Sequence, residues 1–527
     1  MHAAPARAVL ASILVLLLTG SVGAADAVNA ISGGPYLQDP GQTHMTVMWT
    51  SDQSPNGTVR YGAGTAADKL AKVTCTELAY AKDQEQWRTP LQELSGSQIA
   101  KAYVYKARLD GLQPGTTYRY VVDCGGQRPE GSFRTFPAKP EPFTFIEFGD
   151  THFSDRVASC FGEHNPAFLI NTGDLVTDEY YDEYRQFLSE SISAAAGRAP
   201  LLISRGNHDG SGKILSSLFS FPGGKLYYSF DYGNAHFVCL DSVIWRFPDR
   251  EANIKAMLEW CERDLKASKA TWKIVFFHEP PYDMSDIRGE PPVREYLPVL
   301  RRCGTDLVMS GHAHAYERFR PLFWPGENEL HPITYVISGG GYKGTKDVQR
   351  ADPHLAVRKN GSHYVVYAID GETLTARALT NKGKLLDTFT IVKKDGRLDP
   401  AYLAQAVSEE PFARLDRGLF DIRLPKASFD AGETFVVKLN LEAGSQATSV
   451  DVVMAEDSRA AELLEPAKGI IPANGSLALT LRLKAKTALE ACKDGTTHPG
   501  ITFDCRYKAG KLEGVIASNE AHSTPPP

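Results

Sequence analysis

Five short segments in the middle of the chain each end an apolar run with side chains that can bind metal ions. In most of these segments a glycine stands directly before the first such side chain and allows the backbone to turn sharply there. Carboxylate, amide and imidazole groups without a thiolate suit Mn, Fe, Zn or Co better than a structural zinc site. The candidate ligands are Asp150, His152, Asp174, Asn207, His278, His312 and His314.

The size of this set indicates two metal ions rather than one. It exceeds what a single tetrahedral ion accepts, and it fits two ions that share a bridge. Pairs of ions about 3.5–4 Å apart are a known arrangement for hydrolysing phosphate esters. A single histidine at a strand end is more often a hydrogen-bonded surface residue. Chance placement of all five segments in this order is improbable, so the sequence predicts a binuclear metal centre.

The five segments resemble the motifs of calcineurin-like metallophosphoesterases, in the same order and with similar spacing. They are Gly149-Asp150-Thr151-His152, Gly173-Asp174, Gly206-Asn207-His208-Asp209, His278 and Gly311-His312-Ala313-His314. Together with an N-terminal part that resembles fibronectin type III domains, they make the purple-acid-phosphatase-like proteins the most similar subgroup. The resemblance implies an α/β fold, a four-layer αββα sandwich, with all-β sandwich domains at both ends.

The resemblance also implies a role for each residue. One ion of Fe, Mn or Zn would be held by Asp150, His152, Asp174 and His314, and a second by Asp174, Asn207, His278 and His312, with Asp174 as the bridge. His208 would lie over the substrate as a catalytic residue, and Asp209 would orient its imidazole. Asn207 would also face the substrate. Arg288, on the loop after His278, and Tyr316, at the rim of the site, are further candidates for substrate contact.

One position departs from the purple acid phosphatases. These enzymes have a tyrosine three residues after the aspartate of the second motif, and this chain has Thr177 there. It carries His152 instead, as general metallophosphoesterases do. Because an imidazole then replaces the tyrosinate that colours the iron, we expect a colourless or pale protein.

The elements that must position these residues alternate between strand and helix. Apolar runs predict strands over 143–148, 201–204, 273–277 and 307–309, and helical patterns cover 179–196 and 252–265. Alternation of this kind indicates a sheet with helices packed on its faces. Such sheets place their ligands on loops at the carboxyl ends of the strands. We therefore expect a metallophosphoesterase domain over 143–394.

Alternation of apolar and polar residues predicts a β domain on each side of the metallophosphoesterase domain. In the region 28–137, Met45, Val47 and Trp49 alternate with polar residues, and the turn 111–118 resembles the turn that a tyrosine corner pins in fibronectin type III domains. A proline-rich linker follows over 137–142. In the region 399–520, alternating apolar residues over 435–441 and 477–483 predict a C-terminal β-sandwich.

The first 24 residues have the pattern of a cleaved signal peptide, with Arg7 before a short apolar run and small residues at the end. We therefore expect a secreted or periplasmic protein without a membrane span after cleavage. In an oxidising compartment the cysteines suggest disulfides. Proximity in the chain favours the pairs Cys75–Cys124 and Cys492–Cys505.

The expected reaction is hydrolysis of phosphate monoesters, as in acid phosphatases, by attack of a metal-bridging hydroxide. The first alternative is a phosphodiesterase acting on cyclic nucleotides, phospholipid headgroups or polymer phosphodiesters. A second alternative is a non-catalytic surface-binding protein with a decayed hydrolase domain. The net charge of −6 over 527 residues argues against dedicated nucleic-acid binding and leaves a small-molecule or polymer phosphoester as the expected partner. The oligomeric state is left open.

Overall fold

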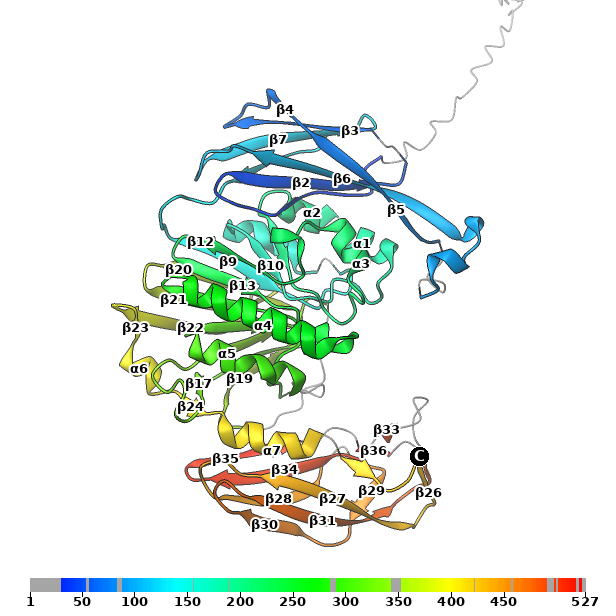
Figure 1. Cartoon of the computed structure of the whole chain (residues 1–527), viewed down its shortest axis with the longest axis vertical. Helices are drawn as coiled ribbons and strands as arrows, with labels where there is room; N and C mark the ends of the chain where they lie inside the picture. The colour runs from blue at the N-terminus through cyan, green and yellow to red at the C-terminus, as the bar shows by residue number, and fades with distance from the viewer. Residues whose placement is uncertain are drawn as a thin grey trace, which may run out of the picture.

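The fold was analysed in a computed structural model of the whole chain. The structure describes residues 30–53, 56–82, 88–154, 156–188, 190–284, 291–342, 352–420, 422–455, 458–490, 497–498, 501–517 and 521–523. The predicted signal peptide, Arg288 and Cys492 lie outside these residues. Figure 1 shows the chain running from an N-terminal β domain at the top, through a central α/β domain, to a C-terminal β domain at the foot.

The central domain contains two seven-stranded sheets. The first has the order β11-β10-β9-β20-β21-β22-β23, with β9 (Phe143–Phe148), β10 (Leu169–Asn171), β11 (Leu201–Ile203), β20 (His363–Asp370), β21 (Thr373–Thr380), β22 (Leu385–Lys394) and β23 (Arg397–Leu398). The second has the order β12-β13-β14-β15-β18-β16-β19, with β12 (Tyr228–Tyr232), β13 (Ala235–Cys239), β14 (Trp272–Phe276), β15 (Leu307–Ser310), β18 (Thr334–Ser338), β16 (Ala315–Phe319) and β19 (Leu355–Asn360).

Alternate side chains of the central strands enter two different hydrophobic cores. On β14, Ile274 and Phe276 lie in the core that also holds Phe145 of the first sheet. Val275, between them, lies in the core that holds Met257 of a covering helix. Because both faces of these strands are buried, their sequences are continuous apolar runs rather than alternating patterns.

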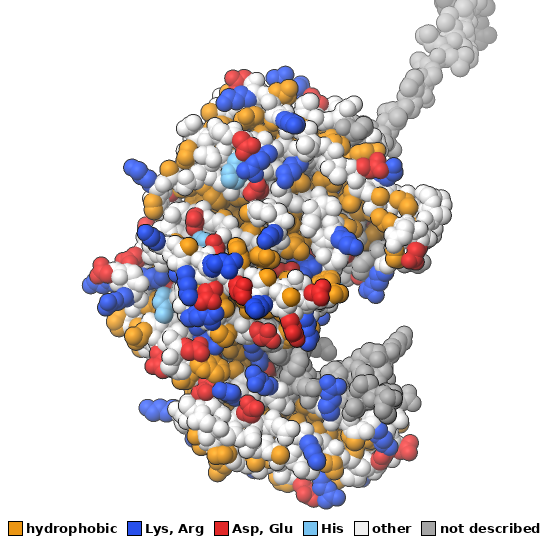
Figure 2. Space-filling view, in the orientation of Figure 1, with side chains coloured by type: hydrophobic (Ala, Val, Ile, Leu, Met, Phe, Trp, Pro, Cys, Tyr) orange, Lys and Arg blue, Asp and Glu red, His pale blue; other side chains and the backbone are white. Residues whose placement is uncertain are grey.

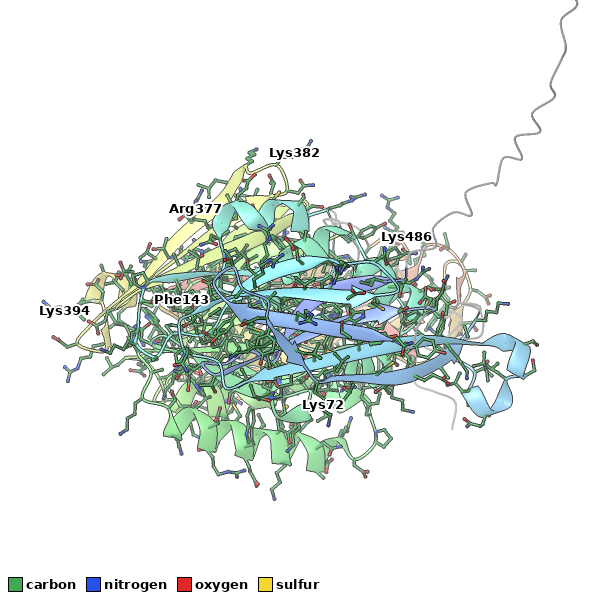
Figure 3. The ribbon with its side chains drawn as sticks, turned by 90° about the horizontal axis from the view of Figure 1, so that it is seen from above. Lys72, Phe143, Arg377, Lys382, Lys394 and Lys486 are labelled. Atoms are coloured by element: carbon green, nitrogen blue, oxygen red, sulfur yellow. The ribbon has the colours of Figure 1, made fainter. Side chains whose placement is uncertain are left out.

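Helices cover the outer faces of the sheets and give the expected four layers. They are α1 (Tyr181–Phe187), α2 (Glu190–Ala196) and α3 (Lys213–Leu218) beside the first sheet, and α4 (Arg250–Ala267) and α5 (Leu297–Arg302) beside the second. The single helix predicted over 179–196 is wrong, because it is divided into α1 and α2 near Leu188. Seen from above, α4 runs along one side of the molecule and the strand that carries Arg377 lies on the opposite side (Figure 3).

The N-terminal domain is a sandwich of two four-stranded sheets. One has the order β1-β2-β6-β5, with β1 (Gly33–Gln38), β2 (His44–Ser51), β6 (Ile99–Asp110) and β5 (Val73–Ala81), and the other has the order β4-β3-β7-β8, with β4 (Lys69–Ala71), β3 (Gly57–Ala63), β7 (Thr117–Cys124) and β8 (Glu130–Arg134). The hydroxyl of Tyr118 accepts a hydrogen bond of 2.9 Å from the backbone N–H of Gln113, which is the tyrosine corner. Gln38 joins the two domains by donating to the carbonyl of Leu201 (2.7 Å).

The predicted disulfide between Cys75 and Cys124 is wrong, since both thiols are free. Cys75 is exposed on β5, whereas Cys124 is buried at the end of β7 in the facing sheet. Tyr105 pairs in register with Cys75 and lies near both thiols. Its burial, and to a smaller extent the two thiols, raises the pKa of its phenol. The second predicted pair includes Cys492, which lies outside the described residues.

The C-terminal domain is a β-sandwich, as the alternating patterns predict. Its larger sheets have the orders β27-β31-β29 and β30-β28-β34-β35, with β27 (Thr434–Glu442), β31 (Ser476–Ala485), β29 (Ala461–Leu463), β30 (Ala467–Ile471), β28 (Thr448–Met454), β34 (Phe503–Ala509) and β35 (Leu512–Ala517). The helix α7 (Glu410–Phe420) packs on β27 and β35 and connects this domain to the central one.

The surface and the helices add two observations. On the face shown in Figure 2, basic and acidic side chains are interspersed rather than separated by sign, consistent with the small net charge. Among the described residues, no helix has the length and apolar character needed to cross a membrane.

Candidate metal centre

The predicted ligands follow the carboxyl ends of parallel strands in both sheets. Asp150, Asp174 and Asn207 follow β9, β10 and β11 of the first sheet, and His278 and His312 follow β14 and β15 of the second. His314 stands directly before β16. Because parallel strands end at one edge of their sheet, each sheet delivers its ligands to the same edge.

The backbone at the ligands themselves is strained. Asp150, His152, Asp174 and His312 all have positive φ angles of 42–68°, a conformation that L-residues rarely adopt and that concentrates at functional sites. Phe153, next to His152, shares this conformation with a φ of 55°. The ligand loops are therefore held in geometries that the surrounding fold imposes.

The glycines before the ligands are needed mainly because no space remains there for a side chain, rather than because the backbone adopts an unusual conformation. A Cβ on Gly206 would lie 2.1 Å from an Asp174 oxygen, and one on Gly311 would lie 2.4 Å from an Asp150 oxygen. Only Gly173 among the glycines before ligands has a positive φ, of 97°. Any side chain at Gly206 or Gly311 would thus displace a ligand carboxylate.

The first donor cluster consists of Asp150, His152 and His314, whose ligand atoms lie within 4.8 Å of one another. The Nε2 atoms of the two histidines are 3.1 Å apart, and Nε2 of His314 is 3.5 Å from Oδ1 of Asp150. That carboxylate oxygen is buried and has no hydrogen-bond partner within the described part of the chain. Nitrogen and oxygen lone pairs that converge in this way fit a bound cation.

The second donor cluster consists of Asp174, His278 and His312. Nδ1 of His278 donates to the carbonyl of Thr172 (2.8 Å), so its Nε2 faces the cluster, 3.3 Å from Oδ2 of Asp174. Oδ1 of Asn207 is 2.9 Å from Nε2 of His278 and 2.9 Å from Nδ1 of His312. The carbonyl partner fixes the tautomer of His278, as is usual for histidines that bind metals.

A hydrogen bond and a charge interaction join the clusters. The backbone N–H of His312, from the second cluster, donates to Oδ2 of Asp150 in the first (2.8 Å). The negative charge of Asp174 reaches His152, where it opposes the lowering of the pKa by burial. The two clusters therefore form one site that both sheets share.

The protonation equilibria of the second cluster reflect burial and mutual charge. Burial, followed by the charge of His278, lowers the pKa of His312 to about 3, which keeps that imidazole neutral and able to bind a metal. Burial opposes charge on His278, yet the Asp174 carboxylate raises its pKa to about 10. Burial also opposes charge on Asp174, but His278 holds the pKa of this carboxyl well below its usual value.

Asp209 does not orient His208, so that prediction is wrong. Its carboxylate is fully buried and accepts from the backbone N–H groups of Gly206 (2.8 Å), Asp174 (3.0 Å) and Leu175 (3.2 Å), and from the hydroxyl of Tyr184 (3.3 Å). Burial, followed by repulsion from Asp174, raises the pKa of Asp209 to about 7. Asp209 therefore ties two ligand loops together.

His208 is oriented by a different group, which the sequence did not reveal. Its Nδ1 donates to the carbonyl of Thr177 (2.6 Å), and its backbone N–H donates to Oδ1 of Asp174 (2.8 Å). Its ring lies edge-on to His152, with the ring centroids 5.0 Å apart. Because Nδ1 is occupied, Nε2 is the ring atom that can meet a substrate.

Tyr316 is not at the rim of the site, contrary to the sequence-based prediction. Its side chain is fully buried on β16 in the core between the sheets, and its hydroxyl donates to Asp387 (2.8 Å). Arg288 lies outside the described residues.

Two ion pairs with buried carboxylates, which the sequence did not predict, support the ligand loops. Arg205, two residues before Asn207, pairs with Asp241 (2.7 Å). Glu279, directly after His278, pairs with Arg246 (2.7 Å). Both pairs join segments far apart in the sequence, so no local pattern indicates them.

Comparisons with known proteins match two parts of the chain to known families. Residues 143–316 match the family model of the calcineurin-like phosphoesterases, and residues 35–135 match that of the purple acid phosphatase N-terminal domain. Purple acid phosphatase 18 of Arabidopsis thaliana is 27% identical over 330 residues, which cover 58% of this chain and 70% of the relative. Acid phosphatase type 7 of Mus musculus is 26% identical over 416 residues, which cover 68% of this chain and 89% of the relative.

A solved structure shows the same fold. The purple acid phosphatase PPD1 from seeds of yellow lupin (Lupinus luteus) superposes with a TM-score of 0.56 at 19% identity, and the match covers 71% of this chain and 77% of that one. The family implies a binuclear metal centre, and the described residues provide two adjacent donor clusters for it. The chain is therefore a calcineurin-like metallophosphoesterase of the purple-acid-phosphatase-like subgroup, a metal-dependent phosphoric ester hydrolase.

Proposed function

We propose that this protein hydrolyses phosphate monoesters at a binuclear metal centre. The observation that carries the proposal is the convergence of two donor clusters, each with ligands from both sheets, with His208 beside them. The names of the relatives, which are acid phosphatases, favour monoesters over diesters.

The site residues have distinct roles in this proposal. Asp150, His152, Asp174 and His314 would hold one ion, Asp174, Asn207, His278 and His312 would hold the other, and Asp174 would contribute to both. A donor set of oxygen and nitrogen atoms would suit Fe, Mn or Zn. When bound, the pair of ions lowers the pKa of a water molecule and neutralises charge on the phosphoryl oxygens.

His208 supplies the contribution of the protein itself to the reaction. With Nδ1 donating to the Thr177 carbonyl, the ring is oriented so that Nε2 can hydrogen-bond a phosphoryl oxygen or the leaving-group oxygen. A preorganised donor of this kind stabilises charge in the transition state at little reorganisation cost.

A comparison of two substrates tests the proposed function. We expect the metal-replete full-length protein to hydrolyse nitrophenyl phosphate with a kcat/KM at least about tenfold above that for bis(nitrophenyl) phosphate. A preference for the diester would favour the phosphodiesterase alternative. Inactivity towards both, with metal bound, would favour the non-catalytic alternative.

We also infer that the protein is secreted or periplasmic, on the signal-peptide pattern of residues 1–24. N-terminal sequencing of the exported protein tests this inference. It predicts a new N-terminus near residue 25, and an intact Met1 on the exported protein would contradict it.

A further inference from the structure

The loop that orients His208 is itself held by a buried carboxylate. Glu183, on α1, is buried. Its Oε2 accepts from the backbone N–H of Thr177 (2.7 Å) and from that of Asp178 (3.0 Å). The carbonyl of Thr177 in turn accepts from Nδ1 of His208 (2.6 Å). A carboxylate and the imidazole proposed to meet the substrate therefore contact the same short stretch of backbone.

The carboxylate and the imidazole bind opposite ends of one peptide group. The Thr177 carbonyl and the Asp178 N–H belong to the same peptide bond, which is trans. In a trans peptide the C=O and the N–H point in opposite directions, so Glu183 lies on one side of this peptide and His208 on the other. A hydrogen bond to a carboxylate polarises the peptide group and makes its carbonyl oxygen a stronger acceptor.

A second carboxylate ties this loop to the segment that carries His208. Glu179, two residues after Thr177, accepts from the backbone N–H groups of Ser211 (2.7 Å) and Ile214 (3.2 Å). Its Oε2 also accepts from the Ser211 hydroxyl (2.8 Å). Because the two segments are bonded at this second place, the hydrogen bond between Thr177 and His208 is held at a fixed geometry.

Glu183 influences the site by its charge without holding metal. It is a member of neither donor cluster. Burial raises the pKa of Glu183, and the hydrogen bonds from the N–H groups of Asp178 and Thr177 oppose that rise because they stabilise the charged form. Positive charge on His208 opposes it as well. The carboxylate and the imidazole therefore interact electrostatically across the peptide that separates them.

We propose that Glu183 is a positioning residue for His208 and acts through the peptide between Thr177 and Asp178. It fixes the carbonyl that receives Nδ1, so that Nε2 faces the substrate, and its negative charge strengthens the Nδ1 hydrogen bond. This inference rests on the proposed function, in which His208 contacts the phosphoryl or leaving-group oxygen, and deepens it by naming the group that makes this contact effective.

A double-mutant cycle separates this role from a structural one. We expect Glu183→Gln to lower kcat for nitrophenyl phosphate about tenfold with little change in KM, because the carboxamide keeps an acceptor but loses the charge. In the His208→Ala background the same change should lower kcat by less than about twofold, because the residue through which Glu183 acts is gone. Glu183→Ala, which also removes the acceptor, should lower kcat further than Glu183→Gln in the presence of His208 only.

Asp182→Asn is the matched control. It removes a negative charge from the neighbouring position of α1, where the carboxylate contacts Arg185 and the Tyr180 hydroxyl (3.1 Å each). We expect its kcat to equal that of the wild-type protein, and elemental analysis to find the same metal content in every variant. A comparable loss of kcat in Asp182→Asn, or loss of metal in Glu183→Gln, would overturn the inference.

The cycle also distinguishes failure of this inference from failure of the proposed function. An equal fold-loss of kcat from Glu183→Gln with and without His208 would overturn the inference, while the proposed function stands. A metal-replete wild-type protein that does not hydrolyse nitrophenyl phosphate would overturn both.

Discussion

The Nε2 atoms of His152 and His314 lie 3.1 Å apart, although the two residues are separated by 162 positions and belong to different sheets. Two imidazole nitrogens at this distance need either a shared proton or a shared cation between them. The adjacent Asp150 oxygen, which is buried without a hydrogen-bond partner among the described residues, favours the cation.

Replacing His208 by alanine should lower turnover without loss of metal. The ring of His208 donates to the Thr177 carbonyl and lies edge-on to His152, but His208 itself is not a member of either donor cluster. We expect kcat on nitrophenyl phosphate to fall by roughly 10²–10³, the scale of losing one preorganised donor. Steady-state kinetics and elemental analysis of the same preparation measure both quantities. A variant that loses metal would show that His208 holds an ion rather than the substrate.

Replacing Asp209 by alanine should destabilise the fold. The change leaves three backbone N–H groups buried without their acceptor, at a cost of about 3 kcal/mol in the free energy of unfolding or more. Tyr184→Phe is the matched control, because it removes only the hydroxyl that donates to the same carboxylate, and it should cost about 1 kcal/mol. Denaturant unfolding measures both variants. An Asp209→Ala variant with full stability and reduced turnover would instead support a catalytic role.

The metal-replete protein should be colourless or pale. Thr177 stands where purple enzymes carry a tyrosine. Its hydroxyl is 3.5 Å from Nδ1 of His152. A visible absorption spectrum of the iron-loaded protein tests this expectation. A charge-transfer band that disappears on mutation of a tyrosine, for example Tyr342→Phe near His152, would contradict it.

His236 should make the stability of the protein depend on pH. Burial alone would lower its pKa, but hydrogen bonds to Asp231 (2.7 Å) and Asp264 (3.0 Å) raise it to about 9 in the folded state. The stabilisation is therefore complete below the unfolded pKa of about 6.5 and is lost as the pH rises through about 9.

The variant His236→Gln measures that contribution. We expect it to lower the free energy of unfolding clearly at a pH of about 6 and much less at a pH of about 9.5. An equal loss at both values would show that packing, rather than charge, is what His236 contributes. The two carboxylate partners of His236 give it a structural role away from the metal ligands.

The sequence indicated the strand ends that carry most of the candidate ligands, because these side chains follow short buried strands. An apolar run that ends in a glycine and a polar residue reports both burial and a strand end, and these are local properties. The predicted strands over 143–148 and 307–309 correspond to β9 and β15 for the same reason.

Side-chain direction and distant pairing could not be predicted in this way. His208 and Asp209 are neighbours in sequence, yet Asp209 turns inward to the ligand loops while His208 reaches Thr177. Tyr316 lies on a strand with both faces buried, so its alternation carries no signal about exposure. The pair Arg246–Glu279 joins loops of different strands, and such contacts appear only after folding.

Anomalous diffraction from crystals of the metal-replete protein tests the binuclear centre most directly. We predict two peaks about 3.5–4 Å apart, one at Asp150, His152 and His314 and the other at Asn207, His278 and His312, with Asp174 contacting both. A single peak, or ions bound away from these side chains, would contradict the account.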